Sequence, residues 1–258
     1  MQPKKRFGQN FLQDKQILSE LTNCLKILPQ DKFLEIGPGK GDFTENILNL
    51  CNNYHGIEID KDLFKLLENK FKNKNSIFHN EDILKFEAEK LFNKSKFRIV
   101  GNIPYNISSP LLEWCEKRYE MISDMHFMLQ KEFALRCSGN ENTSSYGRLS
   151  VICNYLYDME ILKEVDKSFF SPKPKVDSLF VRFTPKKNTY LPRELSNLKK
   201  ITRTLFNKKR KKISNSLSDI FDKKSLENLE ININLDLRPD ELSLDKYLQL
   251  ASQLEENA

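Results

Sequence analysis

A short apolar run meets three glycines in the stretch Lys32-Phe33-Leu34-Glu35-Ile36-Gly37-Pro38-Gly39-Lys40-Gly41. Its first five residues have the length and composition of a buried strand. Glycines at the end of such a strand let the backbone approach a ligand closely, and a helix that follows presents free N–H groups to it. The stretch therefore predicts the first strand–loop–helix unit of a nucleotide-binding α/β sheet. A tight turn without a ligand is the alternative for a glycine loop taken alone.

Short apolar runs and helical patterns alternate along the chain as far as Pro185. Further strands are expected over residues 54–59, 76–79, 97–100, 125–129, 160–165 and 178–183. Helices are expected over residues 17–28, 43–50 and 63–71, and another starts with Ser109 as N-cap and Pro110 at its first position. This order predicts a largely parallel sheet with helices on both faces. Beyond Pro185 only helical periodicity recurs, so we expect a first domain over residues 1–185 and a helical domain over residues 186–258.

Charge is distributed unevenly over the chain. Its 42 Lys and Arg residues against 36 Asp and Glu residues give a net charge of +6. Residues 186–212 hold eleven basic residues and one acidic residue, whereas residues 213–258 hold four basic and ten acidic residues. A cationic segment of this density attracts a phosphate polyanion, and apolar residues interleave it at helical spacing. We therefore predict nucleic-acid binding by residues 186–212, and a solvated helix face is the alternative.

Composition excludes several classes of protein. Hydrophobic residues make up 39% and charged residues 30%, which suits a soluble packed domain. No apolar stretch approaches the ~18–20 residues of a membrane helix, and the amino terminus lacks the apolar core of a secretion signal. Five widely spaced cysteines and three histidines without ligand spacing predict reduced thiols and no metal site. These features together predict a cytoplasmic protein.

Two acidic residues follow the next two strands after the glycine loop. Glu58 lies at the end of the second strand, 21 residues after Gly37, where a carboxylate can accept hydrogen bonds from both hydroxyls of a ribose. Asp82 follows the third strand, where it can accept from an adenine amino group. A ribose and an adenine, without the glycine spacing of a dinucleotide site, predict S-adenosylmethionine as the cofactor. A nicotinamide cofactor is the alternative.

The tetrapeptide Asn102-Ile103-Pro104-Tyr105 follows the fourth strand, at the sheet edge where α/β folds bind ligands. The amine of adenine is a poor nucleophile because its lone pair is conjugated into the ring. The side-chain oxygen of Asn102 and the carbonyl of Ile103 can each accept one N–H, which favours a pyramidal nitrogen ready to attack a sulfonium methyl. Tyr105 offers a face on which the base can stack. The alternative is an ordinary turn that contains proline.

Four segments carry motifs, two of them already described in part. They read Lys4-Lys5-Arg6-Phe7-Gly8-Gln9-Asn10-Phe11-Leu12, Glu35-Ile36-Gly37-Pro38-Gly39, Asn102-Ile103-Pro104-Tyr105-Asn106-Ile107-Ser108 and Ser171-Pro172-Lys173-Pro174-Lys175-Val176-Asp177-Ser178. Together they resemble the ribosomal RNA adenine dimethyltransferases, and within that family the bacterial KsgA (RsmA) branch. The resemblance covers nearly the whole chain. It implies a seven-stranded Rossmann-like methyltransferase sheet in residues 1–185 and an RNA-binding role for the helices of residues 186–258.

The same resemblance implies an activity and a set of site residues. The activity is the transfer of methyl groups from S-adenosylmethionine to the N6 amines of two adjacent adenosines in the 3′-terminal hairpin of 16S rRNA, each methylated twice. The partner would be a precursor of the small ribosomal subunit, and we expect a monomer that binds neither membrane nor metal. Tyr105 and Phe170 would lie on opposite faces of a flipped adenine. Cofactor contacts are implied for Asn10, Leu12, Gly37, Glu58, Asp82 and Asn102.

One residue departs from the pattern of the branch. Ile103 stands where this branch more often has Leu, and the related antibiotic-resistance methylases of large-subunit rRNA often have Ile. A 23S rRNA adenine methyltransferase is therefore one alternative. A largely non-catalytic ribosome assembly factor and a DNA adenine methylase are two others. The basic residues 206–212 resemble the carboxyl-terminal domain of the small-subunit branch. They therefore favour a small-subunit rRNA dimethyltransferase over these alternatives.

Overall fold

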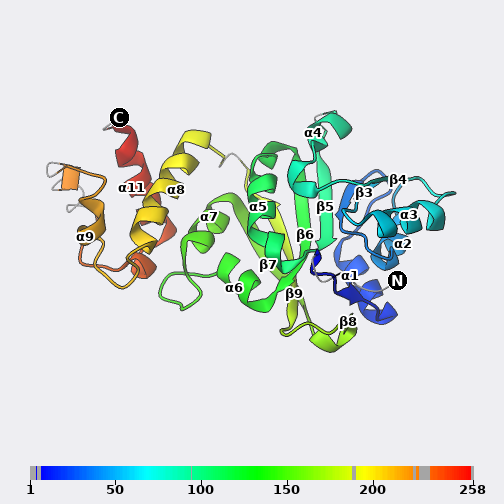
Figure 1. Ribbon diagram of the computed structural model, residues 1–258. Coiled ribbons are helices and arrows are strands. Elements are labelled where there is room, and N and C mark those ends of the chain that lie inside the picture. Colours follow the sequence, from blue (N-terminus) through cyan, green and yellow to red (C-terminus); the bar gives the residue numbers. More distant parts are fainter. Residues whose placement is uncertain are drawn as a thin grey trace. The chain divides into compact units, whose positions relative to one another are not determined.

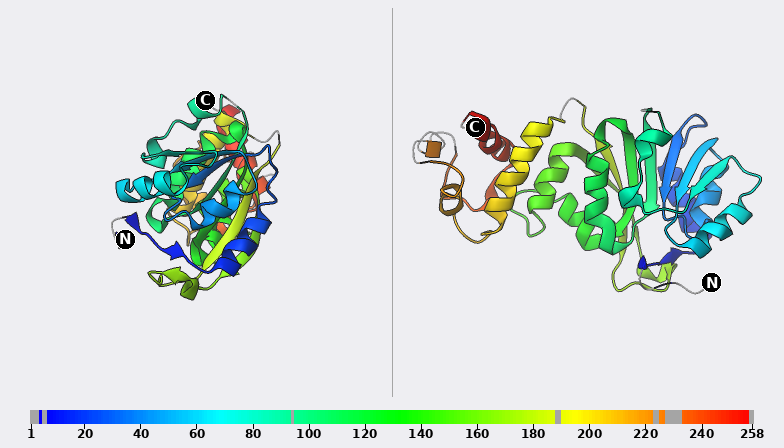
Figure 2. Two further views of the ribbon diagram at one scale, coloured as in Figure 1. Left: turned by 90° about the vertical axis from the view of Figure 1, so that its right-hand side faces the viewer. Right: turned by 45° about the horizontal axis from the view of Figure 1, so that its top comes forward.

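The computed structural model describes residues 4, 7–93, 95–187, 190–222, 225–226 and 233–256. Contacts divide the chain into two compact units. The first comprises Met1–Lys131 and Met159–Pro185, and the second comprises Glu132–Asp158 and Lys186–Ala258. Lys5 and Arg6 of the amino-terminal motif lie outside the described residues. Figures 1 and 2 show the path of the chain.

A seven-stranded sheet forms the centre of the first unit, in the order β4-β3-β2-β5-β6-β9-β7 (Figure 1). The strands from β4 to β6 run parallel, and β9 pairs antiparallel with β6. The sheet therefore confirms the predicted α/β fold class. Its strands are β2 (Lys32–Ile36), β3 (Asn53–Ile57), β4 (Ser76–His79), β5 (Phe97–Asn102), β6 (Ile122–Gln130), β7 (Tyr157–Val165) and β9 (Ser178–Pro185).

Helices cover both faces of this sheet (Figure 2). On one face, Leu21 and Ile47 belong to a buried apolar cluster that includes Phe180 of β9. Another helix is fixed by Trp114, whose indole N–H donates to the carbonyl of Phe86 at 3.0 Å. The helices of this unit are α1 (Lys15–Cys24), α2 (Asp42–Leu48), α3 (Lys61–Lys70), α4 (Ala88–Leu91) and α5 (Ser108–Glu116).

The structure moves several predicted boundaries. The helix expected over residues 17–28 ends at Cys24, and Lys26 has a positive φ of 47°. The helix expected to have Ser109 as its N-cap begins two residues earlier, at Ser108 with Ile107 as its N-cap. Two short strands, β1 (Phe11–Leu12) and β8 (Phe170–Ser171), pair antiparallel and were not expected, because two residues carry no periodicity.

Gly41 shows why the turn after β2 needs glycine. Its φ is +76°, a conformation that glycine adopts without strain. A Cβ atom at this position would lie 2.5 Å from the ring of Phe71 and 3.0 Å from Leu67. The turn can therefore pack tightly against α3, which places the start of α2 directly after the glycine loop.

A partly buried ion-pair network fixes the amino ends of the central strands. Arg98 of β5 donates to Asp31 at 2.7 Å and to Asp124 at 2.8 Å. It also donates to the carbonyl of Leu25 at 2.6 Å, and its guanidinium lies 4.9 Å from the centroid of the Phe33 ring. Every charge in this network has a partner, which a buried pair requires. The network is confined to one edge of the sheet and leaves the carboxyl edge open.

The second unit is helical. Tyr247 and Phe206 stack at a centroid distance of 5.9 Å, and the Tyr247 hydroxyl donates to the carbonyl of Pro239 at 2.6 Å. The predicted division into residues 1–185 and 186–258 stays a prediction. The compact units differ from it in placing residues 132–158 with the carboxyl-terminal helices, because α7 packs against α8 and α11. The helices are α6 (Lys131–Cys137), α7 (Arg148–Leu156), α8 (Pro192–Phe206), α9 (Ser214–Leu217) and α11 (Leu244–Glu256).

Several exclusions drawn from composition can be compared with the structure. Within the described ranges, no helix has the length and apolar character needed to cross a membrane. The five cysteines are free thiols, and four of them are buried. Among the described residues, no group of three or more His, Cys, Asp or Glu side chains could hold a metal ion.

Candidate active site

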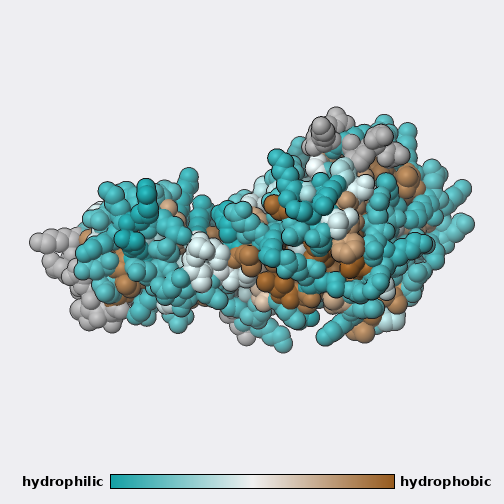
Figure 3. Space-filling view, turned by 90° about the horizontal axis from the view of Figure 1, so that it is seen from below, coloured by the Kyte–Doolittle hydropathy of each residue, from teal (hydrophilic) through white to brown (hydrophobic). Residues whose placement is uncertain are grey.

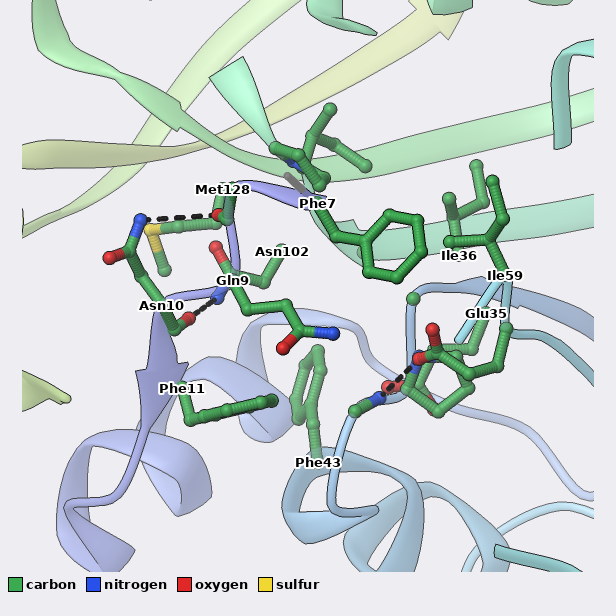
Figure 4. Close-up of a pocket in the computed structure, with 18 of the residues that line it drawn as sticks. Phe7, Gln9, Asn10, Phe11, Glu35, Ile36, Phe43, Ile59, Asn102 and Met128 are labelled. Carbon is green, nitrogen blue, oxygen red and sulfur yellow. Dashed lines mark hydrogen bonds between the residues drawn. The ribbon is translucent and has the colours of Figure 1, made fainter. Parts of the chain in front are cut away.

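A cavity of about 350 Å³ opens at the carboxyl ends of the parallel strands. Loops that follow β2, β3 and β5 line it, together with the amino-terminal segment of residues 7–12 (Figure 4). Its volume suits a small-molecule ligand or cofactor. The predicted site residues that line it are Asn10, Leu12, Gly37, Glu58, Asp82, Asn102 and Tyr105.

Part of the lining of the cavity is exposed and apolar. Figure 3 looks at the molecule from below the view of Figure 1, where β8 and the amino-terminal segment lie. Brown, hydrophobic residues form a group on this face and smaller patches elsewhere on it, and most of the visible surface is hydrophilic. Ile59, which lines the cavity, is 48% exposed and contributes apolar surface to it. Exposed apolar surface in a concave site is typical of ligand binding.

Glu58 lies directly after β3 and is held by backbone donors. Its Oε2 accepts from the N–H of Gly39 at 3.1 Å, and its Oε1 accepts from the N–H of Asp60 at 2.9 Å. Burial of the side chain raises the pKa of the carboxyl above its usual value, and these backbone donors oppose the rise. A carboxylate has about four acceptor sites, so that of Glu58 keeps capacity for a hydroxyl of a ligand beside its backbone donors.

Asp82 stands at the start of a short 3-10 helix, Ile83–Lys85. Its Oδ1 accepts from the N–H of Leu84 at 3.0 Å, which fixes the side chain as an N-cap. The second oxygen remains as an acceptor at the cavity. Ile59 and Ile83 also line the cavity, so an aromatic ring held by Asp82 would meet apolar surface.

Asn102 is the last residue of β5, and its amide is oriented by the amino-terminal segment (Figure 4). Its Nδ2 donates to the carbonyl of Asn10 at 2.7 Å. Because only the nitrogen of an amide can donate to a carbonyl, the Oδ1 atom is left as the acceptor. The next residue is fixed through its backbone, since the N–H of Ile103 donates to the carbonyl of Met128 at 3.1 Å.

Tyr105 begins the 3-10 helix that follows Pro104. Its ring is half-buried at the cavity, and burial raises the pKa of its hydroxyl above the usual value. The group therefore stays protonated near neutral pH. Ser178, at the start of β9, opposes this rise in the pKa of Tyr105.

The structure does not bring Phe170 into the cavity. Its side chain is 5% exposed and belongs to the buried cluster that includes Leu21, Val165 and Phe180. Its backbone lies next to the site, because β8 pairs Phe170 with Leu12. Stacking of Phe170 on a base stays a prediction, and in this structure the ring is covered by core residues.

Sequence reasoning missed several residues of the cavity. Figure 4 shows Gln9, Phe11 and Phe43 around the same space, with Met128 beside Asn10. Gln9 and Phe11 flank Asn10 in the amino-terminal motif, so the motif could have predicted that they lie at the site. Phe43 and Met128 carried none, because apolar residues in a helix and a strand are typical of a core.

The glycine loop and Phe11 fit each other closely. A Cβ atom on Gly39 would lie 2.9 Å from the ring of Phe11, and the ammonium of Lys40 lies 4.9 Å from the centroid of that ring. The loop can therefore come this near to the amino-terminal segment only with glycine. The cavity is consequently bounded by the loop on one side and by the segment on the other.

The carboxylate of Glu35, the acidic residue before the loop, is hydrogen-bonded by neighbouring side chains of the core. Its Oε2 accepts from the hydroxyl of Tyr54 at 2.5 Å and from that of Thr44 at 2.7 Å. Burial raises the pKa of this carboxyl to about 7. Its hydrogen bonds link β2, α2 and β3 beneath the cavity, which gives Glu35 a structural role.

Comparison with known proteins places these features in a family. A model of the family described as "Ribosomal RNA adenine dimethylase" matches residues 1–256. The "Ribosomal RNA small subunit methyltransferase A" of Saccharophagus degradans is 39% identical over 254 residues, which cover 97% of this chain and 94% of that protein. The protein of the same name from Herminiimonas arsenicoxydans is 39% identical over 254 residues, or 98% of each chain.

Two crystal structures have a similar fold. A dimethyladenosine transferase from Plasmodium falciparum matches with a TM-score of 0.83 and 26% identity, covering 95% of this chain and 98% of that one. The 23S rRNA methyltransferase ErmE matches with a TM-score of 0.74 and 26% identity, covering 95% and 99%. The similarity therefore extends over both compact units of the chain.

Proposed function

Because the chain belongs to the ribosomal RNA adenine dimethylase family, we propose that it dimethylates the N6 amines of two adjacent adenosines in the 3′-terminal hairpin of 16S rRNA. The methyl donor is S-adenosylmethionine, the cofactor of this family. The observation that carries the proposal is the amide of Asn102, whose nitrogen is held by the Asn10 carbonyl. Its oxygen is thereby kept as an acceptor for an amine. We place the reaction in the cytoplasm, on a precursor of the small ribosomal subunit, with the enzyme acting as a monomer.

The relatives support the choice of the small subunit over the large one. The proteins from S. degradans and H. arsenicoxydans are named for the small subunit and share 39% identity with this chain. ErmE, named for 23S rRNA, shares 26%. Ile103 alone favours the large subunit, and a conservative exchange at one apolar position weighs less than similarity along the whole chain.

The residues of the cavity fit the predicted cofactor. The carboxylate of Glu58 keeps acceptor capacity beside its backbone donors, which suits a ribose hydroxyl. Asp82 keeps one acceptor for the adenine amine, and Gly39 allows close approach at the loop. When bound, the cofactor supplies an electrophilic methyl group on sulfur. We assign Asn10, Leu12, Gly37, Glu58, Asp82 and Asn102 to its binding.

The chain's own groups then prepare the target base. A base inside a stack is out of reach, so the adenine must be flipped into the site. The Oδ1 of Asn102 and the carbonyl of Ile103 accept its two N–H groups and stabilise the positive charge that develops on nitrogen. Tyr105 stacks on one face of the base, and Phe170 remains the predicted partner on the other face.

The proposal is tested by mass spectrometry of 3′-terminal fragments of small-subunit rRNA. Unmodified rRNA should gain N6,N6-dimethyladenosine at two adjacent positions when it is incubated with this protein and S-adenosylmethionine. Methylation confined to 23S rRNA would support the large-subunit alternative and contradict the proposal. Binding to the precursor without any methyl transfer would leave only a role in assembly.

The basic segment supports RNA binding, but its charges are not equivalent. Lys208 pairs with Asp219 at 3.0 Å, and Lys212 pairs with Asp236 at 2.8 Å. Lys209 is tied to the carbonyl of Tyr146 and to Asp240. Arg210 and Lys211 are exposed, and within the described part of the chain they have no ion-pair partner. We therefore assign most phosphate contacts to these two side chains.

Replacing both Arg210 and Lys211 with glutamine should weaken RNA binding and flatten its salt dependence. Two lost phosphate contacts should change the slope of log K against log salt by roughly 1.5–2, because each contact releases counterions. The measurement is a salt titration of binding to the rRNA hairpin. The double variant Lys208→Gln, Lys212→Gln is the matched control and should change the slope less. Equal slopes in the wild type and the Arg210, Lys211 variant would show that the segment is only a solvated face.

A further inference from the structure

The amino-terminal segment crosses the cavity and is fastened on both sides of it. We call Lys4 and residues 7–12 the strap. Every residue from 7 to 12 lines the cavity, opposite the glycine loop. Its end at β1 is hydrogen-bonded to β8, and its other end reaches the start of α3. A ligand in the cavity would therefore lie beneath the strap.

The fastening near α3 is a small network of charged and polar groups. The ammonium of Lys4 lies 2.7 Å from Oδ1 of Asp60 and 2.6 Å from Oδ2 of Asp62. The backbone N–H of Lys4 donates to the side-chain carbonyl of Gln9 at 2.8 Å. The Nε2 of Gln9 in turn donates to Oδ2 of Asp60 at 3.1 Å. Both carboxylate oxygens of Asp60 are thus held by the strap.

Asp60 connects this network to the proposed ribose site. Its side chain is 2% exposed, and its own N–H donates to Oε1 of Glu58 at 2.9 Å. The residue that the strap grips is therefore the one whose backbone orients Glu58. Asn102 is held by the same strap, through the carbonyl of Asn10. A displacement of the strap would remove the acceptor of the Asn102 amide and the donors that hold the side chain of Asp60.

The exposed half of the network allows it to open. The side chain of Lys4 is 31% exposed and that of Asp62 is 57% exposed, so water can replace their contact. Ion pairs at such sites contribute little to stability. When the Lys4 ammonium leaves, Oδ1 of Asp60 would still accept the hydrogen bond from the N–H of Asp62 at 3.0 Å. Opening therefore leaves no buried charge without a hydrogen bond.

We propose that Lys4, Gln9 and Asp60 form a latch that holds the strap over the bound cofactor and opens each time the cofactor is exchanged. The inference rests on the proposed function. Each transferred methyl group leaves S-adenosylhomocysteine in the cavity, so this product must depart before the next transfer. Lys4 and Asp60 are positioning residues in this scheme, because they act through the strap and through Glu58.

The test measures the rate at which S-adenosylhomocysteine leaves the full-length protein, by stopped-flow displacement with excess S-adenosylmethionine. In Lys4→Met, release should become roughly 10-fold faster, since a charge-assisted hydrogen bond is lost. KM for the cofactor should rise by a similar factor. The single-turnover rate at saturating cofactor should stay within about 2-fold, because the strap then closes over an occupied site.

Two further variants separate a latch from a general structural effect. Lys4→Arg keeps the charge and the donors and should restore slow release. Lys61→Met removes an exposed cation from the neighbouring α3 and should release the product at the wild-type rate. Wild-type release in Lys4→Met would overturn the latch, and so would equal acceleration in Lys61→Met. If the wild type does not bind S-adenosylhomocysteine, the proposed function itself fails. This outcome can be told apart from the two release rates that would overturn the latch alone.

Discussion

Replacing Asn102 with alanine is expected to slow both methyl transfers by about 10²–10³-fold, the usual cost of losing one positioned polar group in an active site. The wild-type side chain is fixed by its 2.7 Å hydrogen bond to the Asn10 carbonyl, so in the proposed reaction its oxygen would meet the amine without reorganisation. Alanine offers no acceptor at this point. The variant should still bind S-adenosylmethionine, because Glu58 and Asp82 remain.

Single-turnover assays that resolve N6-methyladenosine from N6,N6-dimethyladenosine measure this effect. Asn53→Ala serves as a matched control, since Asn53 is exposed at the amino end of β3. It should retain normal rates for both steps. Near-normal dimethylation by Asn102→Ala would refute the role of its oxygen as acceptor.

Replacing Glu58 with alanine should lower the affinity for S-adenosylmethionine by about 10²–10⁴-fold. Two hydrogen bonds from ribose hydroxyls to a carboxylate are lost, each worth roughly 1.5–3 kcal/mol. The substitution also removes the acceptor of the Gly39 and Asp60 N–H groups. Glu58→Gln is therefore the better-matched variant, because it keeps one acceptor oxygen. Isothermal titration calorimetry measures both affinities.

The pH dependence of cofactor affinity provides an independent check on Glu58. Burial raises the pKa of this carboxyl, so protonation begins at a higher pH than for an ordinary glutamate. A protonated carboxyl accepts fewer hydrogen bonds, and affinity should therefore fall as the pH is lowered through that raised pKa. The Glu58→Gln variant should lose this pH dependence, and the exposed Glu68→Gln should keep it. Unchanged affinity in Glu58→Ala would refute the assignment.

Much of the sheet could be predicted because its strands are buried and apolar. The strands at residues 32–36 and 76–79 were predicted with the observed bounds. The second strand was predicted to run to residue 59 but ends at Ile57, since Glu58 turns its carboxylate to the backbone of the loops. The grouping of residues 132–158 with the carboxyl-terminal helices had no sequence signal, because it depends on packing between helices far apart in the chain.

In the candidate site too, residues in motifs could be predicted, whereas residues placed by packing could not. Polar residues at strand ends, such as Glu58, Asp82 and Asn102, could be predicted to meet because parallel strands end at one edge. Phe170 could not be placed in this way. Its neighbours along the chain lie beside the site, but its ring packs in the core. The orientation of a side chain in a two-residue strand depends on contacts that the sequence does not reveal.

In the proposed reaction, the fixed amide of Asn102 would also distinguish the methylation states of the base. Adenine brings two N–H donors to two acceptors, and each methyl group added removes one donor. The dimethylated base has none, so the Asn102 oxygen, which cannot turn away while its nitrogen is bound to Asn10, faces a methyl group. An acceptor left without a partner costs about 1–3 kcal/mol. Each methyl transfer would therefore lower the affinity of the site for the base, and the dimethylated nucleotide would bind most weakly.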